Sequence, residues 1–249
     1  MCLAILTLEP NRLFLAANRD EERARPSAPP RTWACDGVTV TAPIDERAGG
    51  TWLGCNDRGL FAVITNRSDL DSPAPGSVRS RGHLVREVLE AGGVDEARAR
   101  VEADRTTPSA PFNLLFGEVG EVWIAARREQ GETELRPVMS SLFVVSNHGD
   151  PDDDSVGEIE HAREAWAATT ASNPLARGHE VLTRRANPDG LPPLLKTGAE
   201  YGTVSASVLE LVAGRETRFW FADGPPHVAA FEEVERPSTR ANPPTGARR

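Results

Sequence analysis

The sequence predicts an α+β fold in which antiparallel sheets form layers with helices. Strand-like runs come in pairs separated by short turn segments, which gives hairpins where a parallel sheet would need long crossovers. Groups of strands are followed by groups of helices, an order typical of layered α+β folds. With 249 residues and 39% hydrophobic side chains, the chain can bury one sizeable core. We therefore expect a single domain over residues 1–234 and a flexible, Pro- and Arg-rich tail over 235–249.

The first third of the chain predicts two hairpins. Pro10 and Asn11 suit the first turn, and Gly59, which tolerates positive φ, suits the second. The segment Arg23–Arg31 between the hairpins is rich in Pro and Arg and is expected to be a surface loop. The expected strands are Cys2–Leu8, Leu13–Ala17, Gly50–Cys55 and Leu60–Thr65.

Helical periodicity begins in the next segment and alternates with further strands. A stripe of Val and Leu residues predicts a helix from near Ser77 to Gly92-Gly93. Further helices are expected over 95–103, 158–170 and 180–185. Later strands are expected at Phe112–Glu118, Glu121–Ala126, Leu142–Ser146, Val204–Val212 and Thr217–Phe221.

Charge and cysteine content narrow the classes of function. The chain has 28 Lys and Arg against 37 Asp and Glu, a net charge of -9, which argues against nucleic-acid or anionic-membrane surfaces. Its three cysteines lack CxxC spacing, so no disulfide framework or cysteine zinc site is indicated. No signal peptide or membrane-spanning run is recognised. A cytoplasmic protein without membrane insertion, acting on a small-molecule ligand, is expected.

Cys2 is the strongest candidate for a reactive residue in the chain. If Met1 is removed, Cys2 carries both a thiol and a free α-amino group. An α-amine has a reference pKa of about 7.7 to 8.0 and a thiol one of about 8.5, so the amine can take the thiol proton near neutral pH. The sequence thus offers a nucleophile and its base in one residue.

Polar side chains containing Asn follow three of the expected strands. The tetrad Asn18-Arg19-Asp20-Glu21 ends one strand, Asn66-Arg67 ends another, and Asn147-His148 ends a third. Turn propensity alone explains any single Asn in such a place. Their joint occurrence with Cys2 favours a functional site.

These residues, with several further motifs, resemble the NRDE family, also known as the Transport and Golgi Organisation protein 2 homologues. The individual matches are short, but their order along roughly residues 1 to 212 is specific. The matching segments are Met1-Cys2, Asn18-Arg19-Asp20-Glu21, Gly50-Thr51-Trp52-Leu53-Gly54, Asn56 to Leu60, Thr65-Asn66, Ser80-Arg81-Gly82 with Leu84-Val85, Phe112-Asn113-Leu114, Ser146-Asn147 and Tyr201-Gly202-Thr203.

The resemblance implies a four-layer αββα sandwich of N-terminal-nucleophile hydrolase type, with two stacked, mainly antiparallel sheets flanked by helices. The chain also looks distantly like the choloylglycine hydrolase and penicillin V acylase group, which begins Met-Cys and cleaves amides. The family itself has links to haem trafficking and acyl-lipid metabolism and no settled enzymatic reaction.

The resemblance also implies roles for individual residues. Cys2 would be the nucleophile, Asp20 the partner that orients its amine, and Arg19 a cation that favours the thiolate. Asn147 would donate to the oxyanion, with Asn66 as its neighbour. The candidate ligand-binding residues are Asn18, Trp52, Asn66 and His148, although Trp52 also suits a core position.

Two departures are from the family itself, and one is from the related hydrolases. Their Arg and Asp are separated by two residues, whereas Arg19 and Asp20 are adjacent, and adjacent strand residues point to opposite faces. Val204 stands where family members commonly have Arg, so an expected pocket cation is missing. The segment with Asp152-Asp153-Asp154 lacks the family's usual Trp and Lys.

Two classes of function remain open. The first is a cysteine amidohydrolase or acyltransferase, which requires no cofactor. The second is a non-catalytic carrier of haem or of an acyl-lipid or acyl-CoA on the same fold, with His148 as an axial ligand by type. A purely structural scaffold ranks third, because no coiled coil, repeat or anchor is recognised. The five histidines show no metal-binding spacing and Asp152 to Asp154 no EF-hand pattern, so no metal is expected.

Overall fold

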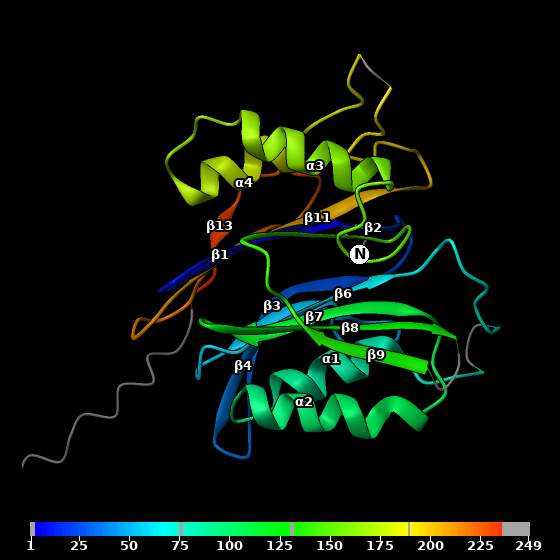
Figure 1. Ribbon diagram of the computed structural model, residues 1–249, viewed down its shortest axis with the longest axis vertical. Helices are drawn as coiled ribbons and strands as arrows, with labels where there is room; N and C mark the ends of the chain where they lie inside the picture. The colour runs from blue at the N-terminus through cyan, green and yellow to red at the C-terminus, as the bar shows by residue number, and fades with distance from the viewer. Residues whose placement is uncertain (1–2, 75–76, 130–131, 189, 236–249) are drawn as a thin grey trace, which may run out of the picture.

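Four layers build the molecule, in the order helices, sheet, sheet, helices (Figure 1). The computed structural model describes residues 3–74, 77–129, 132–188 and 190–235. The first sheet has the strand order β10-β1-β2-β11-β12-β13, and the second has β3-β4-β5-β6-β7-β8-β9. All pairings between these strands are antiparallel. The predicted four-layer sandwich is therefore confirmed.

The strands and helices have the following bounds. In the first sheet they are β1 Leu3–Glu9, β2 Arg12–Glu22, β10 Leu142–Ser146, β11 Tyr201–Val212, β12 Arg218–Ala222 and β13 Glu232–Glu233. In the second they are β3 Ser27–Cys35, β4 Val38–Asp45, β5 Leu53–Asn56, β6 Phe61–Asn66, β7 Phe112–Glu118, β8 Glu121–Glu129 and β9 Glu132–Pro137. The helices are α1 Arg81–Leu89, α2 Val94–Ala103, η1 Asp104–Thr106, α3 Gly157–Ala168 and α4 Pro174–Leu182.

Side-chain alternation along β1 separates two hydrophobic cores. Ala4 and Leu6 belong to the core that fills the space between the sheets and extends to α1 and α2. Leu3 and Ile5 belong to the core beneath α3 and α4. A period of two is what a strand buried on both faces requires. Each face of the first sheet thus meets a different layer.

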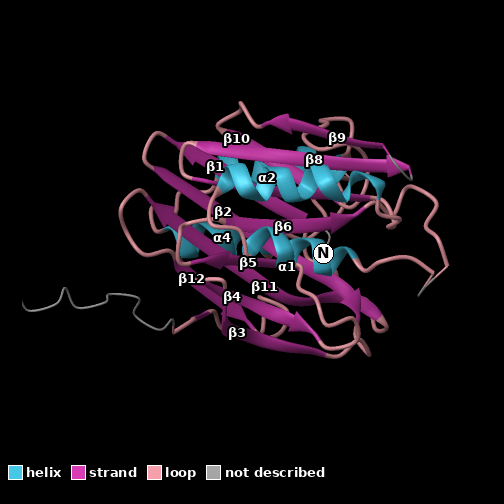
Figure 2. Cartoon of the chain, turned by 90° about the horizontal axis from the view of Figure 1, so that it is seen from below, coloured by secondary structure: helices cyan, strands magenta, loops and turns pink. Residues whose placement is uncertain are grey.

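The helices cover the outer faces of the two sheets. Figure 2 shows α1 and α2 lying across the second sheet, where α1 packs on β6 and α2 on β7. Helices α3 and α4 lie on the first sheet, over β10 and β2. The buried face of α1 carries Leu84, Val85, Val88 and Leu89, as the predicted stripe requires.

The strand predicted over Leu13–Ala17 continues as β2 to Glu22, and strands β4 and β9 were not predicted. Three further predictions need correction. The predicted loop Arg23–Arg31 contains the start of strand β3, because Pro29 and Pro30 lie on an edge strand where the register is irregular and no ladder donor is needed. Helix α1 begins at Arg81 rather than near Ser77, since the Arg79 backbone bridges to Ser109.

The third correction concerns α4, which was expected over 180–185 and spans Pro174–Leu182. The Asn173 side chain caps it by accepting from Leu175 and Ala176, and Pro174 follows at the first helical position, a common start signal. Gly178 lies mid-helix because a Cβ there would come within 3.1 Å of the Phe14 ring. This close approach to β2 overrides the low helix propensity of glycine.

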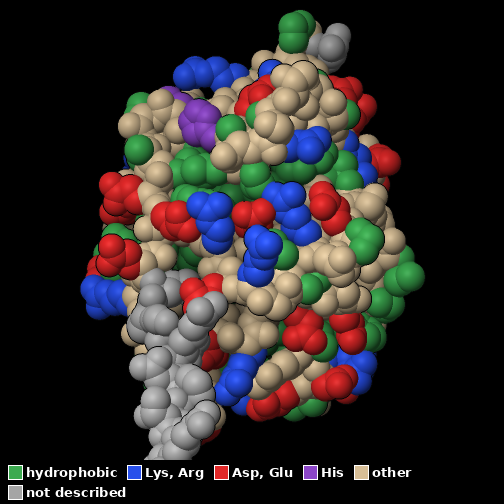
Figure 3. Space-filling view, turned by 90° about the vertical axis from the view of Figure 1, so that its left-hand side faces the viewer, with side chains coloured by type: hydrophobic (Ala, Val, Ile, Leu, Met, Phe, Trp, Pro, Cys, Tyr) green, Lys and Arg blue, Asp and Glu red, His purple; other side chains and the backbone are tan. Residues whose placement is uncertain are grey.

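Charge is mixed on the face drawn in Figure 3. Blue basic and red acidic side chains are interspersed among those shown in colour, with no continuous basic patch. Within the described ranges, no helix combines the length and apolar character needed to cross a membrane. The predicted tail lies outside the described residues except for Glu235.

Candidate active site

The start of β1 lies between the middle of β2 and the end of β10. Leu3 pairs with Asn18 of β2 on one side and with Ser146 of β10 on the other. Cys2, the predicted nucleophile, lies outside the described residues and is joined to Leu3 by a peptide bond. Two of the three polar segments singled out in the sequence are thereby brought next to the beginning of β1. The first of them does not follow a strand as predicted, because β2 continues through it to Glu22.

The residues of the tetrad Asn18-Arg19-Asp20-Glu21 alternate between the two faces of β2. Asn18 faces the α3–α4 layer, where its Nδ2 donates to the Leu182 and Leu194 carbonyls at 2.9 Å each. Asp20 lies on the same side by alternation and accepts from Thr203 Oγ1 at 2.6 Å. Arg19 faces the second sheet, with its Cζ 4.0 Å from the Trp52 ring centroid. Adjacent residues therefore point to opposite faces, as predicted.

Arg19, Trp52 and Asn66 line one polar pocket of ≈ 150 Å³. The pocket opens between the end of β2, the start of β5, the end of β6 and the beginning of α1. Trp52 is also buried in the main core, so both of its predicted positions apply. The complete lining is Arg19, Glu21, Arg25, Asp45, Thr51, Trp52, Ile64, Asn66, Ser80, Arg81 and Gly82.

Two glycines allow the pocket walls to approach each other. A Cβ on Gly50 would lie 2.5 Å from the Gly82 carbonyl carbon, and one on Gly82 would lie 2.9 Å from the Thr51 carbonyl oxygen. The Thr51 amide donates to the Gly82 carbonyl at 3.1 Å. Any side chain at these positions would push the walls apart, which explains why both sequence motifs contain glycine.

The cations of this pocket differ in their partners. Arg25 binds Asp45 through two nitrogens, the shorter contact being 2.6 Å. Burial would raise the pKa of Asp45, but the Arg25 hydrogen bond and charge hold it below its usual value. Burial lowers the pKa of the Arg19 and Arg81 guanidinium groups. Among the described residues, neither has a carboxylate oxygen within 4.0 Å.

The two predicted oxyanion donors occupy different surroundings. Asn66 is half-buried at the end of β6 and lines the pocket. Asn147 is buried after β10 and does not contribute to the lining; its Nδ2 donates to Ser68 Oγ at 3.1 Å. The Ser68 amide donates to the Asn147 carbonyl at 2.8 Å. The loops that follow β6 and β10 are thus tied together.

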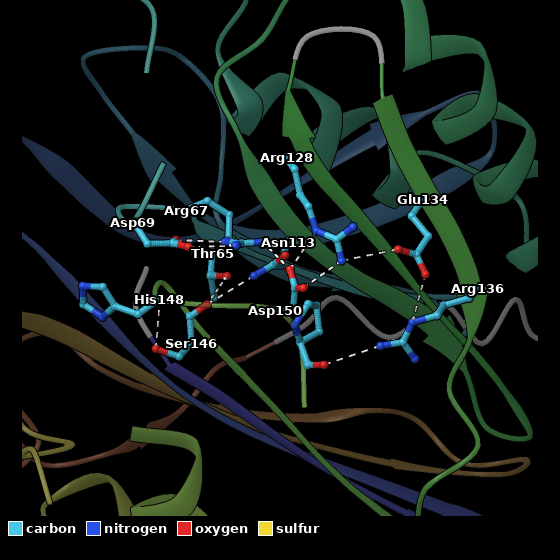
Figure 4. Close-up of polar contacts among 11 residues, drawn as sticks. Thr65, Arg67, Asp69, Asn113, Arg128, Glu134, Arg136, Ser146, His148 and Asp150 are labelled. Atoms are coloured by element: carbon cyan, nitrogen blue, oxygen red, sulfur yellow. Dashed lines mark hydrogen bonds and ion pairs between the residues drawn. The ribbon is translucent and has the colours of Figure 1, made fainter. Parts of the chain in front are cut away.

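An ion-pair network fixes these two loops. Arg67 donates to Asp69 at 2.7 Å and to Asp150 at 2.9 Å, and Arg128 reaches Asp150 at 2.8 Å (Figure 4). Hydrogen bonds that Arg67 donates to Asp69 and Asp150 raise the pKa of Arg67 despite its burial. Because Arg67 follows Asn66 directly, the network holds the pocket residue in place.

A second cluster, centred on Glu158, was not predicted. This buried carboxylate accepts from Lys196 Nζ at 2.7 Å and from Ser146 Oγ at 2.8 Å, and lies 2.9 Å from His148 Nδ1. Burial would raise its pKa, but the hydrogen bonds from Lys196, His148 and Ser146 hold it below the usual value. The available signal was its place on the Ala162 and Ala165 stripe of α3, an acidic residue on an apolar face.

Two further positions singled out in the sequence are His148, which belongs to the Glu158 cluster, and Val204 of β11. The His148 side chain is 49% exposed, and it does not line the polar pocket. Val204 occupies an irregularity of β11, between Thr203 paired with Asp20 and Ser205 paired with Arg19. In the part of the chain described, no group of three or more His, Cys, Asp and Glu could hold a metal ion.

Solved structures with this fold are N-terminal-nucleophile hydrolases. An N-acylethanolamine-hydrolyzing acid amidase ortholog from Caenorhabditis elegans is 14% identical with a TM-score of 0.61, covering 84% of this chain and 92% of that one. Penicillin V acylase from Agrobacterium tumefaciens is 14% identical with a TM-score of 0.55, covering 89% and 83%. These likenesses define the fold class as N-terminal-nucleophile hydrolase type.

The sequence model of Transport and Golgi organisation 2 matches residues 1–220, and the chain belongs to this family. The Transport and Golgi organization protein 2 homolog of Homo sapiens is 36% identical over 98 residues, 36% of this chain and 35% of that protein. The Bos taurus homolog is 35% identical over the same length. The alignment thus spans about a third of these curated relatives.

Proposed function

We propose that this protein cleaves or transfers an acyl group of a small molecule, with Cys2 as nucleophile and its own α-amine as base. The observation that carries this proposal is the register of Leu3 between Asn18 and Ser146, which brings the polar segment of β2 and the end of β10 to the start of β1. The fold class supports it, although fold alone does not establish a reaction.

The proposed reaction has two steps. The α-amine takes the thiol proton while sulfur bonds to the acyl carbon, and the protonated amine then gives that proton to the departing nitrogen as the carbon–nitrogen bond breaks. Water next attacks the thioester, releasing the acid and restoring the thiol. Both steps form an oxyanion, which needs donors aimed at it.

The described residues suit these roles to different degrees. Arg19 would favour the thiolate, because a nearby cation lowers the pKa of a thiol. Asn66 and Asn147 would donate to the oxyanion; an Asn amide has two N–H groups, and Ser68 uses one from Asn147. Asp20 would orient the amine from the side where Thr203 holds its carboxylate.

Intact-mass analysis tests the proposal. Purified protein is treated with an alkyl β-lactone, which acylates reactive thiols, and the Cys2→Ala and Cys35→Ser variants are compared. Cys35 is the matched control, because burial, with the Glu90 and Asp36 carboxylates, raises the pKa of its thiol. We expect a chain without Met1 that gains one acyl group, retains this in Cys35→Ser and loses it in Cys2→Ala. Retention of Met1, or labelling that persists in Cys2→Ala, would contradict the mechanism.

A non-catalytic haem or acyl-ligand carrier is the alternative. The half-exposed His148 ring supports it, since imidazole is a common haem ligand. Against a haem in the polar pocket stands its volume of ≈ 150 Å³, which is below the roughly 300–1,000 Å³ of typical ligand sites. A haem titration comparing wild type with His148→Ala tests this alternative. If the carrier hypothesis is right, haem changes the absorption spectrum of the wild type and this change is lost in the variant. If haem causes no spectral change and the protein has no affinity for acyl-CoA, the carrier hypothesis is wrong.

A further inference from the structure

Arg19 and Arg81 are two cations that share a pocket and have no carboxylate within 4.0 Å among the described residues. An uncompensated charge is costly inside a protein. Arg25 in the same pocket pairs with Asp45, whereas Glu21 acts on Arg19 and Arg81 through its charge alone, without a contact within 4.0 Å. We propose that Arg19 and Arg81 form a subsite for the carboxylate of the ligand. The subsite deepens the proposed function by making the substrate an acyl compound with a free carboxylate, and to that extent rests on it.

The two guanidinium groups are held in place by neutral contacts. Arg19 donates to Ser27 Oγ at 3.0 Å and stacks on Trp52. Arg81 donates through Nη1 to the Pro111 carbonyl at 2.8 Å. A guanidinium has five N–H donors, so each group retains donors for a ligand. The charge of Glu21, and for Arg19 also that of Asp45, acts on these groups without a close contact. Since the three arginines of the pocket outnumber its two carboxylates, an anion would still gain from both groups.

The beginning of α1 adds to the attraction for an anion. Ser80, Arg81 and Gly82 all line the pocket. The Ser80 side chain makes no capping hydrogen bond, and the first turn of α1 contains no acidic residue. The N-terminal end of a helix carries partial positive charge and unpaired amides. The arginines therefore line the pocket together with a helix end.

Charge and size favour a small monoanion, and a carboxylate fits both. Three guanidinium groups and two carboxylates line the pocket, so its net charge is one positive. A monoanion neutralises it, whereas the second charge of a phosphate would face Glu21 and Asp45. A volume of ≈ 150 Å³ equals about five water molecules at about 30 Å³ each. It accommodates a carboxylate and a short stem, and the acyl chain would extend outside.

Isothermal titration calorimetry of the full chain tests the subsite. The probes are N-hexanoylglycine, its neutral primary amide and hexyl phosphate, and the Cys2→Ala variant is used beside wild type so that turnover does not interfere. We expect the acid to bind at least tenfold more tightly than the amide and than the phosphate. Acid that binds no more tightly than the amide, including no binding of either, would overturn the proposal, as would tighter binding of the phosphate.

Arginine variants test whether Arg81 is responsible for binding the acid. Arg81→Met should weaken binding of the acid at least tenfold and abolish the preference over the amide, and Arg81→Lys should fall between. Arg86→Met is the matched control, because Arg86 lies on the same helix, pairs with Glu90 and is outside the pocket. It should bind like wild type. If Arg81→Met keeps the preference for the acid over the amide, the proposed subsite is wrong. Thermal unfolding of each variant shows whether it is folded. The comparison of the three probes in wild type does not depend on any variant.

Failure of the subsite and failure of the nucleophile are separable. Selective binding of the acid without acylation of Cys2 supports the subsite and contradicts the proposed reaction. Acylation of Cys2 without a preference for the acid supports the reaction and overturns the subsite.

Discussion

Arg67 and Arg19 are both buried arginines at strand ends, yet their surroundings are opposite. Arg67 meets the carboxylates of Asp69 and Asp150, and these hydrogen bonds raise its pKa. Arg19 meets a hydroxyl and an indole ring, and burial lowers its pKa. The first arrangement is complete within the protein. The second is completed by an external anion, which distinguishes a structural cation from a binding one.

The same contrast separates Arg127 from Arg81. Arg127 is fully buried and donates to Asp104, Thr107, Thr133 and Ser109. Arg81 is half-buried and has one described acceptor, the Pro111 carbonyl. Replacing an arginine whose partners belong to the protein should therefore lower the free energy of unfolding. Replacing one whose partner is a ligand should instead lower the affinity for that ligand.

Arg127→Met should have the largest effect on stability. The substitution removes hydrogen bonds to Thr107, Thr133, Ser109 and Asp104 at a fully buried site, which at roughly 1 kcal/mol each costs about 3–5 kcal/mol. Asp104 keeps its contact with Arg79 at 2.8 Å. Urea denaturation measures the free energy of unfolding, with Arg128→Met as the neighbouring exposed control, expected to lose under about 1 kcal/mol. If Arg127→Met lowers the free energy of unfolding no more than Arg128→Met does, Arg127 is not a structural cation.

Arg67→Met should cost about 1–3 kcal/mol in the same assay. The loss is smaller because its partners are partly solvated: the Asp69 and Asp150 side chains are 28% and 42% exposed, which weakens ion pairs. A double-mutant cycle with Asp150→Asn should give a favourable coupling energy between the two residues. Additive losses would mean that the pair does not act as a unit.

Arg81→Met should lower the free energy of unfolding by less than about 1 kcal/mol, since one hydrogen bond to a backbone carbonyl is lost and a costly charge is removed. Its main effect is the loss of affinity for the acid described above. A destabilisation as large as that of Arg67→Met would place Arg81 among the structural cations and contradict the distinction.

Asp150→Asn should have the smallest effect, and it should depend on pH. Hydrogen bonds from Arg128 and Arg67 lower the pKa of Asp150 although burial opposes them. Its stabilisation is therefore fully present above the ordinary Asp pKa, about 3.9, and is lost as the pH falls through the lower folded value. Wild type should exceed the variant by about 0.5–1 kcal/mol near pH 7, with the difference vanishing toward about pH 2. A difference that grows in acid would contradict this sign.

The sequence predicted elements whose signal is local. The turn residues around Pro10 and Gly59 and the stripe of α1 identified two hairpins and a buried helix. The alternation of a strand also predicted that Arg19 and Asp20 face opposite ways. Strand β3 was missed because Pro29 and Pro30 normally argue against a strand, and only the sheet order shows that it lies at an edge.

The missed parts of the site depend on contacts between distant segments. Ser80-Arg81-Gly82 was recognised as a motif, but its position beside Arg19 arises from the close approach of Gly82 to Gly50, which no local pattern reveals. The Glu158 cluster joins α3, the end of β10 and Lys196 in the same way. The predicted roles of Cys2, Asp20, Asn66 and Asn147 stay predictions, because Cys2 lies outside the described residues.

A crystal structure of the Cys2→Ala variant with N-hexanoylglycine is the most direct test that an external carboxylate completes this pocket. We expect carboxylate oxygens about 2.7–2.9 Å from guanidinium nitrogens of both Arg19 and Arg81, the distance of a charge-assisted hydrogen bond. A ligand bound elsewhere, or a pocket in which the Glu21 carboxylate pairs with these arginines and excludes the ligand, would contradict it.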